Sequence, residues 1–225
     1  MLVFSAVGSS ALGCALQVPV PRYPWLEDHS LALDAEQLRV RIAPEAVSVT
    51  VRFQFRSVGT VRDRVLTFPI PPPCADVVGF SAALVGPERP AQALASWPSS
   101  PDWLPAEEAR QAFDIEIPGA DLEAHGGRLL VSYSQPCGEA FRFSLQSGAY
   151  WQGPIGQLEV QIDDPGRRAR DARVEEVPPH VARGTTLRWS FLELEPSVGI
   201  ELALGPAQGA TAEQPAAASA AEAAP

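Results

Sequence analysis

The segment VSVTVRFQF at residues 47–55 alternates hydrophobic and polar side chains without a break. Its apolar residues, from Val47 to Phe55, fall on one side of an extended chain. A period of two over this length is typical of a β-strand that covers a core with one face. The segment LRVRI at residues 38–42 alternates in the same way. The short Ala43–Ala46 connection between the two therefore predicts an antiparallel hairpin.

Further segments of this kind follow along the chain, separated by turns rich in Pro and Gly. They lie at residues 64–70, 76–85, 90–96, 113–117, 127–134, 140–145, 157–162, 185–194 and 198–204. One short helix is expected after Pro105, where Ala and Glu replace the alternation. The spacing of the strands favours an all-β fold, an antiparallel β-sandwich that is either one large or two abutting sandwiches.

The sequence divides into three parts by composition. Residues 1–30 are expected to hold an export signal and a linker, and residues 31–205 the β-sandwich domain. Residues 206–225 are rich in Ala and Pro without periodicity, which predicts a disordered tail. The first 21 residues carry no charged side chain and begin MLVFSAVGSSALG, which fits the apolar part of an export signal. That run is too short to span a bilayer.

The segment from Ser10 to Cys14 resembles a bacterial lipoprotein processing box, in which the cysteine thiol receives a diacylglycerol. A plain cleaved signal that ends near Ala15 is the alternative. Either way the sequence predicts an exported protein, in the periplasm or anchored to the outer membrane. Membrane contact is expected only through a lipid on Cys14.

Net charge and residue usage exclude several functions. The chain carries a formal charge of −10, and nucleic acids require a basic face, so no nucleic-acid partner is expected. All 17 basic residues are Arg, which rules out a lysine Schiff base and a P-loop lysine. The sequence contains none of the glycine-rich nucleotide motifs, no G-x-S-x-G and no metal-ligand spacing of His or Cys. We therefore expect no cofactor, no metal and no catalytic residues.

Two cysteines remain in the exported part of the chain. Cys74 and Cys137 each follow a proline-containing turn at a strand end. In an oxidising compartment such a pair predicts one disulfide. A reactive thiol at Cys137 is the alternative, although no His or other base lies near it in the sequence.

Two groups of residues are candidates for binding. Loop aromatics can stack on sugars or anchor a protein partner, but next to Gly-Pro turns they also cover the ends of a sandwich core. Arginines in the segment RRARDAR can receive a phosphate or an acidic neighbour, or lie in a solvated loop. The aromatic candidates are Trp97, Trp103, Tyr150 and Trp151, and the arginines are Arg167, Arg168, Arg170 and Arg173.

Other polar residues have simpler interpretations. His29, His125 and His180 lie in loops and are expected on the surface. Asp163 and Asp164 precede Pro and Gly directly after a strand, and this favours a β-turn over a carboxylate site.

Three stretches resemble an exported bacterial family known as domain of unknown function 4424, at residues 31–71, 147–162 and 187–204. The segment TFPIP at residues 67–71 is similar to its first landmark, and SGAYWQGPIG at residues 147–156 is similar to its second. Residues 187–204 look like its closing strand pair, whereas the region 97–135 is shorter than in the family. Residues 64–95 show a weaker likeness to the N-terminal β domain of inter-α-trypsin-type proteins. The resemblance implies a compartment and a fold, without an activity.

These observations together predict a non-catalytic envelope protein that binds or scaffolds another envelope protein. The sheet edges and the aromatic loops are the expected contact surface. A carbohydrate- or small-ligand-binding module that uses Trp103, Tyr150 and Trp151 is the alternative. An envelope hydrolase would require His125 or His180 to converge on Cys137, a serine or an aspartate.

Overall fold

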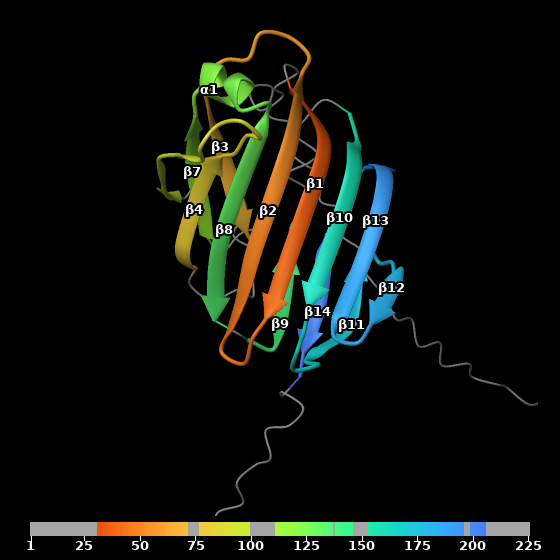
Figure 1. The fold of residues 1–225 in the computed structure, drawn as a ribbon. Helices are drawn as coiled ribbons and strands as arrows, with labels where there is room; N and C mark the ends of the chain where they lie inside the picture. Colours follow the sequence, from red (N-terminus) through yellow and green to blue (C-terminus); the bar gives the residue numbers. More distant parts are fainter. Residues whose placement is uncertain are drawn as a thin grey trace, which may run out of the picture.

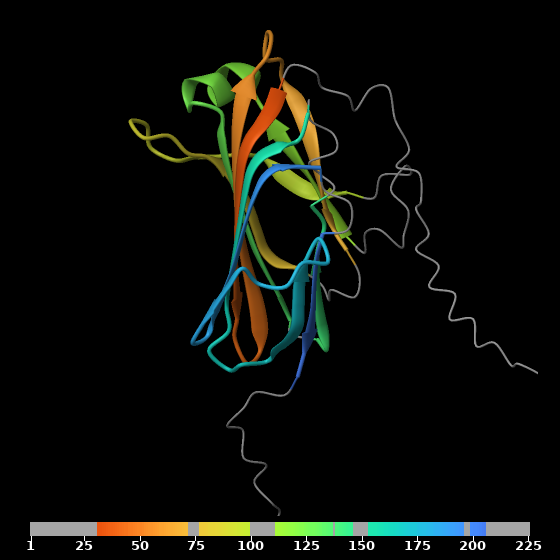
Figure 2. The same cartoon turned by 90° about the vertical axis from the view of Figure 1, so that its right-hand side faces the viewer.

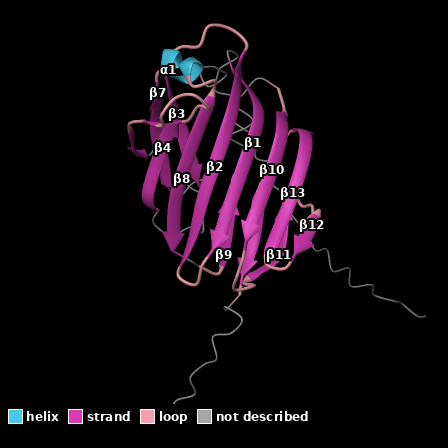
Figure 3. Ribbon diagram, viewed as in Figure 1, coloured by secondary structure: helices cyan, strands magenta, loops and turns pink. Residues whose placement is uncertain are grey.

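The computed structural model describes residues 31–71, 77–99, 111–136, 138–145, 153–195 and 199–205. In these ranges the chain is mostly strand, with one short helix, α1 (Gly119–Ala124) (Figure 3). The predicted all-β fold with one short helix is therefore confirmed. The helix α1 was not predicted from the sequence, and the helix expected after Pro105 lies outside the described residues and stays a prediction. No helix of the described part is long and apolar enough to cross a membrane.

Eight strands form one large sheet, and six form two small ones. The large sheet contains β1 (Leu31–Ile42), β2 (Ala46–Ser57), β4 (Val78–Leu84), β5 (Gln92–Ala93), β8 (Arg128–Pro136), β10 (Ile155–Asp163), β12 (Val181–Arg183) and β13 (Thr186–Leu194). One small sheet contains β3 (Arg64–Ile70), β6 (Ser96–Ser99) and β7 (Gln111–Ile117), and the other contains β9 (Ala140–Phe143), β11 (Ala169–Val174) and β14 (Ile200–Leu204). The order in the large sheet is β12-β13-β10-β1-β2-β8-β4-β5 (Figure 1).

Both small sheets cover the same face of the large sheet (Figure 2). Phe68 of β3 joins all three sheets, because its ring centroid lies 6.0 Å from that of Tyr133 in β8 and 6.1 Å from that of Phe143 in β9. Phe80 of β4 stacks on Phe113 of β7 at a centroid distance of 4.0 Å. The buried apolar side chains form one core cluster, so the fold is one sandwich with a divided second layer rather than two abutting sandwiches.

The predicted hairpin is formed by β1 and β2, which pair antiparallel from Leu31↔Ser57 to Ile42↔Val47. Every second residue of β2 from Val47 to Phe55 is buried, as its alternation predicts. The other side of β1 pairs in parallel with β10, from Ala35↔Gln157 to Arg41↔Asp163. The large sheet is therefore mixed at its centre, whereas the sequence predicted antiparallel pairing throughout.

The arginine-rich segment, expected as a solvated loop in the simpler interpretation, forms β11 at Ala169–Val174. Arg167 and Asp171 have positive φ angles, 48° and 49°, and the pairing with β14 shifts register between Arg170 and Arg173. These irregularities break the period of two, which is why the pattern does not reveal the strand. The segment at residues 90–96 also differs, because it contributes to β5 and β6 in two different layers.

Candidate functional site

Among the predicted aromatic residues, Trp97 lies within the described ranges. It belongs to β6, an edge strand of a small sheet, and its side chain is 41 % exposed. Trp103, Tyr150 and Trp151 lie outside the described residues, as do Cys14, Cys74 and Cys137. The aromatic platform, the lipidation site and the disulfide therefore stay predictions.

The predicted arginine cluster holds chain segments together. Arg168 donates to the carbonyl oxygens of Gly205 (2.9 Å), Ala43 (3.1 Å) and Pro44 (3.1 Å). It thus ties the β1–β2 turn to the end of β14. Arg173 donates to the Glu176 carbonyl oxygen at 3.2 Å. These hydrogen bonds to backbone carbonyl oxygens give Arg168 and Arg173 a structural role.

The other two arginines of the cluster, Arg167 and Arg170, are exposed. Arg170 runs beside Gly205, where a Cβ would lie 2.7 Å from its Nε. Anion binding at the cluster stays a prediction, and it would rest on Arg167 and Arg170.

The histidines are placed differently from one another. His125 is buried at 4 % exposure, and its Nδ1 lies 2.7 Å from the Asp121 carbonyl oxygen. The surface position predicted for it is wrong, because it caps α1, a helix that the sequence did not reveal. His180 is exposed, as predicted, and its Nδ1 accepts the Ser190 backbone N–H at 3.2 Å. His29 lies outside the described residues.

Asp164 confirms the predicted turn. Its backbone carbonyl accepts the Arg167 N–H at 3.1 Å, and its carboxylate accepts the Ala169 N–H at 2.7 Å. The neighbouring Asp163 carboxylate accepts from Gln161 and Thr186. Within the described ranges, no three His, Cys, Asp or Glu side chains are grouped to hold a metal ion.

A groove of about 450 Å³ lies on the outer face of the large sheet, the face away from the two small sheets. Two adjacent rows of paired residues form its floor across β1, β2 and β8. The first row is Gln37, Arg52 and Leu130, and the second is Ala35, Gln54 and Arg128. The loop from Val85 to Pro87, which leads from β4 toward β5, forms one wall. We call this hollow the Arg52–Arg128 groove.

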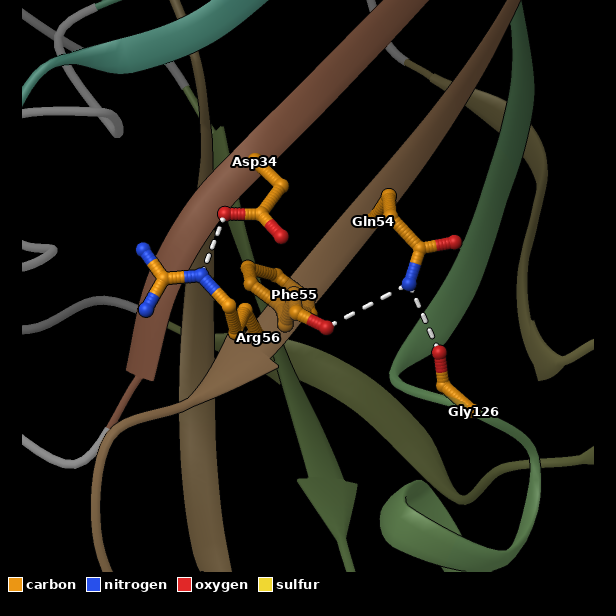
Figure 4. Close-up of polar contacts among 5 residues, drawn as sticks. All are labelled: Asp34, Gln54, Phe55, Arg56 and Gly126. Atoms are coloured by element: carbon orange, nitrogen blue, oxygen red, sulfur yellow. Dashed lines mark hydrogen bonds and ion pairs between the residues drawn. The ribbon is translucent and has the colours of Figure 1, made fainter.

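Gln54 fixes the position of Arg128 in the groove. Its Nε2 donates to the carbonyl oxygens of Gly126 (2.7 Å) and Phe55 (3.3 Å) (Figure 4). Its Oε1 accepts the Nε–H of Arg128 at 2.7 Å. The loop from α1 to β8 comes this close because Gly127 has a φ of +72° and lies against the Phe55 carbonyl, where a side chain would clash.

The acidic side chains nearest along the strands are already engaged. Asp34, next to Ala35 in β1, accepts the Nε–H of Arg56 at 3.0 Å (Figure 4). Glu159 of β10 accepts from Gln157 at 2.8 Å and from Gln37 at 3.4 Å. Glu159 lines a second hollow of about 290 Å³ beside the groove, together with Arg39, Arg188 and His180. The two arginines of the first groove have no carboxylate among its lining residues.

Glu36 is a buried acidic residue that was not among the residues predicted from the sequence. Its side chain is fully buried on the inner face of β1, opposite Phe53 of β2 and Leu158 of β10. Neither carboxylate oxygen has a hydrogen-bond partner within the described part of the protein. Burial alone raises the pKa of Glu36 from 4.5 to about 8. The carboxyl group is therefore mostly neutral at pH 7.

A signal for Glu36 was present in the sequence. The alternation of Leu38, Val40 and Ile42, continued backward by one step, places residue 36 on the inner face. The groove gives no such signal, because Arg52 and Arg128 meet only through the pairing of β2 with β8.

Comparison with known proteins assigns no family. No family model matches the chain, and no curated protein matches it. An M1 zinc metallopeptidase from Deinococcus radiodurans is similar over 77 % of this chain and 42 % of that one, at 9 % identity and a TM-score of 0.39. A putative protease from Parabacteroides distasonis is similar over 77 % of this chain and 40 % of that one, at 11 % identity and a TM-score of 0.40. This chain thus spans less than half the length of either structure.

Proposed function

We propose that this chain is an exported, non-catalytic envelope protein that binds another envelope protein along the free edge of its large sheet. The uncharged, apolar start of the sequence supports export. The resemblance to the exported family described above supports the same compartment. The proposal for the binding function rests on the part of β13 that β12 leaves unpaired.

Strand β13 is only partly covered. On its outer side β12 pairs with Thr186, Leu187 and Arg188, the first three residues of β13. From Trp189 to Leu194 no strand of the described part pairs on that side. An open strand edge is a template for an added strand from another chain.

The direction of the backbone groups follows from alternation in an antiparallel pair. The Ser190 N–H points away from β10, because it donates to His180. The N–H and C=O groups of Leu192 point to the same open side, whereas Glu193, with a φ of 51°, interrupts the alternation before Leu194. Leu192 is 75 % exposed, more than any other large hydrophobic side chain of the described ranges. Open backbone groups and an exposed leucine together fit strand addition by a protein partner.

A site-specific photo-crosslinker at position 192 tests this function. It is introduced into the full chain in the producing cells, with the same crosslinker at the exposed Val65 as the control. We expect one defined adduct from position 192, and its loss when Leu194 is changed to Lys, since a charge on the edge disfavours strand addition. Cell fractionation and the mass of the N-terminal peptide report export and the state of Cys14.

Adducts of equal yield from positions 192 and 65, or an adduct that Leu194→Lys leaves unchanged, would contradict binding at this edge. A chain with an unprocessed N-terminus that stays in the cytoplasmic fraction would contradict export. A melting curve of Leu194→Lys that matches the unmodified chain ensures that loss of the adduct is not loss of the fold.

A further inference from the structure

The Arg52–Arg128 groove has the size of a small-molecule site. Its volume of about 450 Å³ lies in the range of such sites, which is about 300–1,000 Å³. Its floor is made of regular strands, so the residues that line it are held at fixed spacing by sheet register. Ala35 and Leu130 give this floor small and apolar parts between the polar side chains.

The charge of the groove is uncompensated. Arg52 and Arg128 are exposed on the same face and lie diagonally across β2 and β8, a separation that two arginine side chains can bridge. Arg52 makes no hydrogen bond or ion pair with another described residue. Of the acidic residues on β1, Asp34 is paired with Arg56, and Glu36 is buried on the inner face. In a chain of net charge −10, this is a local concentration of positive charge.

The guanidinium group of Arg128 is already held in position without a ligand. Gln54 holds the Nε of Arg128 while itself bonded to the carbonyl of Gly126. Within the described ranges no group accepts from the two Nη nitrogens of Arg128. A guanidinium held by its Nε presents a fixed pair of donors, which is the geometry that carboxylate and phosphate oxygens accept.

We propose that the Arg52–Arg128 groove binds a small ligand through a carboxylate or phosphate group. Arg128 receives the anionic group, and Arg52 contributes a second charge from the neighbouring row. Gln37, opposite Arg52 on β1, offers its amide oxygen to a polar part of the same ligand while its nitrogen donates to Glu159, and Leu130 contacts an apolar part. The groove is separate from the open edge of β13, so this inference goes beyond the proposed function.

Titration with two simple anions tests the proposal. Inorganic phosphate and succinate are added separately to the full chain at constant ionic strength, and backbone amide NMR shifts are followed. We expect a saturable shift confined to the groove residues. Arg52→Gln and Arg128→Gln are each expected to weaken binding about tenfold, since a hydrogen bond to a charged group is lost. Tighter binding of phosphate assigns a phosphoryl ligand, and tighter binding of succinate assigns a carboxylate ligand.

Arg41→Gln is the matched control. Arg41 lies on the same face of the sheet but does not line the groove. Its substitution by Gln removes the same charge as Arg52→Gln or Arg128→Gln. At physiological ionic strength it is expected to change the affinity less than about twofold. An absence of saturable binding for both anions, or an equal loss in Arg41→Gln, would overturn the proposal. Unchanged crosslinking at position 192 in Arg52→Gln keeps this result distinct from the proposed function.

Discussion

Replacing Glu36 by methionine is expected to stabilise the protein at neutral and alkaline pH. Glu36 is fully buried, and neither of its oxygens has a hydrogen-bond partner in the described part of the chain. Burial keeps this carboxyl group protonated at neutral pH, and replacing the group removes the cost of holding that proton without breaking an observed interaction. Methionine is unbranched and of similar length, so it fits the space between Phe53 and Leu158 with little repacking.

The magnitude follows from the pKa of Glu36 in the folded chain, about 8, against 4.5 for an ordinary glutamate. The folded state holds the proton more tightly than the unfolded state, so the stabilisation is complete below pH 4.5 and is lost as the pH rises to 8. Each pH unit in that window costs about 1.4 kcal/mol. Because the unfolded chain loses this proton while the folded chain keeps it, the unfolding free energy falls by about 3 kcal/mol between pH 4.5 and pH 7.

Urea unfolding of the wild type, Glu36→Met and Glu36→Gln at intervals from pH 4.5 to 8.5 measures this effect. The difference in unfolding free energy between Glu36→Met and the wild type is expected to grow by about 3 kcal/mol from pH 4.5 to pH 7. Glu36→Gln has nearly the same shape and no charge, so it is expected to show the same growth. Glu45→Gln removes an exposed charge and serves as the control.

The reasoning would be refuted if the difference between Glu36→Met and the wild type stayed constant across this pH range. It would also be refuted if both variants were less stable than the wild type at pH 8. Either outcome would mean that the Glu36 carboxylate is stabilised in the folded chain.

Two further predictions concern backbone contacts. Gly127→Ala is expected to destabilise the fold by about 3 kcal/mol or more, because its Cβ would clash with the Phe55 carbonyl, whereas Gly126→Ala meets open space and costs about 1 kcal/mol for its positive φ. Equal melting temperatures for the two variants would contradict this. Arg168→Ala is expected to cost about 2 kcal/mol by urea unfolding, through its lost bonds to Gly205, Ala43 and Pro44. Arg167→Ala is the exposed control, and an equal loss there would refute a specific role for Arg168.

Local patterns predicted the strands that repeat with a regular period. The segment at residues 64–70 coincides with β3, and β2 extends the expected segment 47–55 by a residue or two at each end. These strands alternate because one face is buried and the other is solvated. β11 was missed because residues with positive φ, such as Asp171, interrupt its alternation.

Contacts between distant segments could not be predicted in this way. The parallel pairing of β1 with β10 depends on which strand covers the free side of β1, and no local pattern encodes that choice. The groove depends on the register between β2 and β8 and on the return of the chain at Gly126 and Gly127. Of these features, only the burial of Glu36 could have been predicted, because the alternation of buried residues along β1 places position 36 on the inner face.

The parallel pair also affects the order in which the chain can fold. One edge of β1 stays unpaired until β10 docks on it. The first residue of β10, Ile155, follows the last residue of β1, Ile42, by about 110 residues along the chain. This separation along the chain delays the pairing of β1 with β10 relative to the local pairing of β1 with β2. During that time the β1–β2 hairpin exposes an unpaired edge and an uncovered apolar face, including Leu38 and Val40. The nascent chain is therefore most prone to aggregation before β10 docks, and a chaperone that shields this hairpin would increase the yield of folded protein.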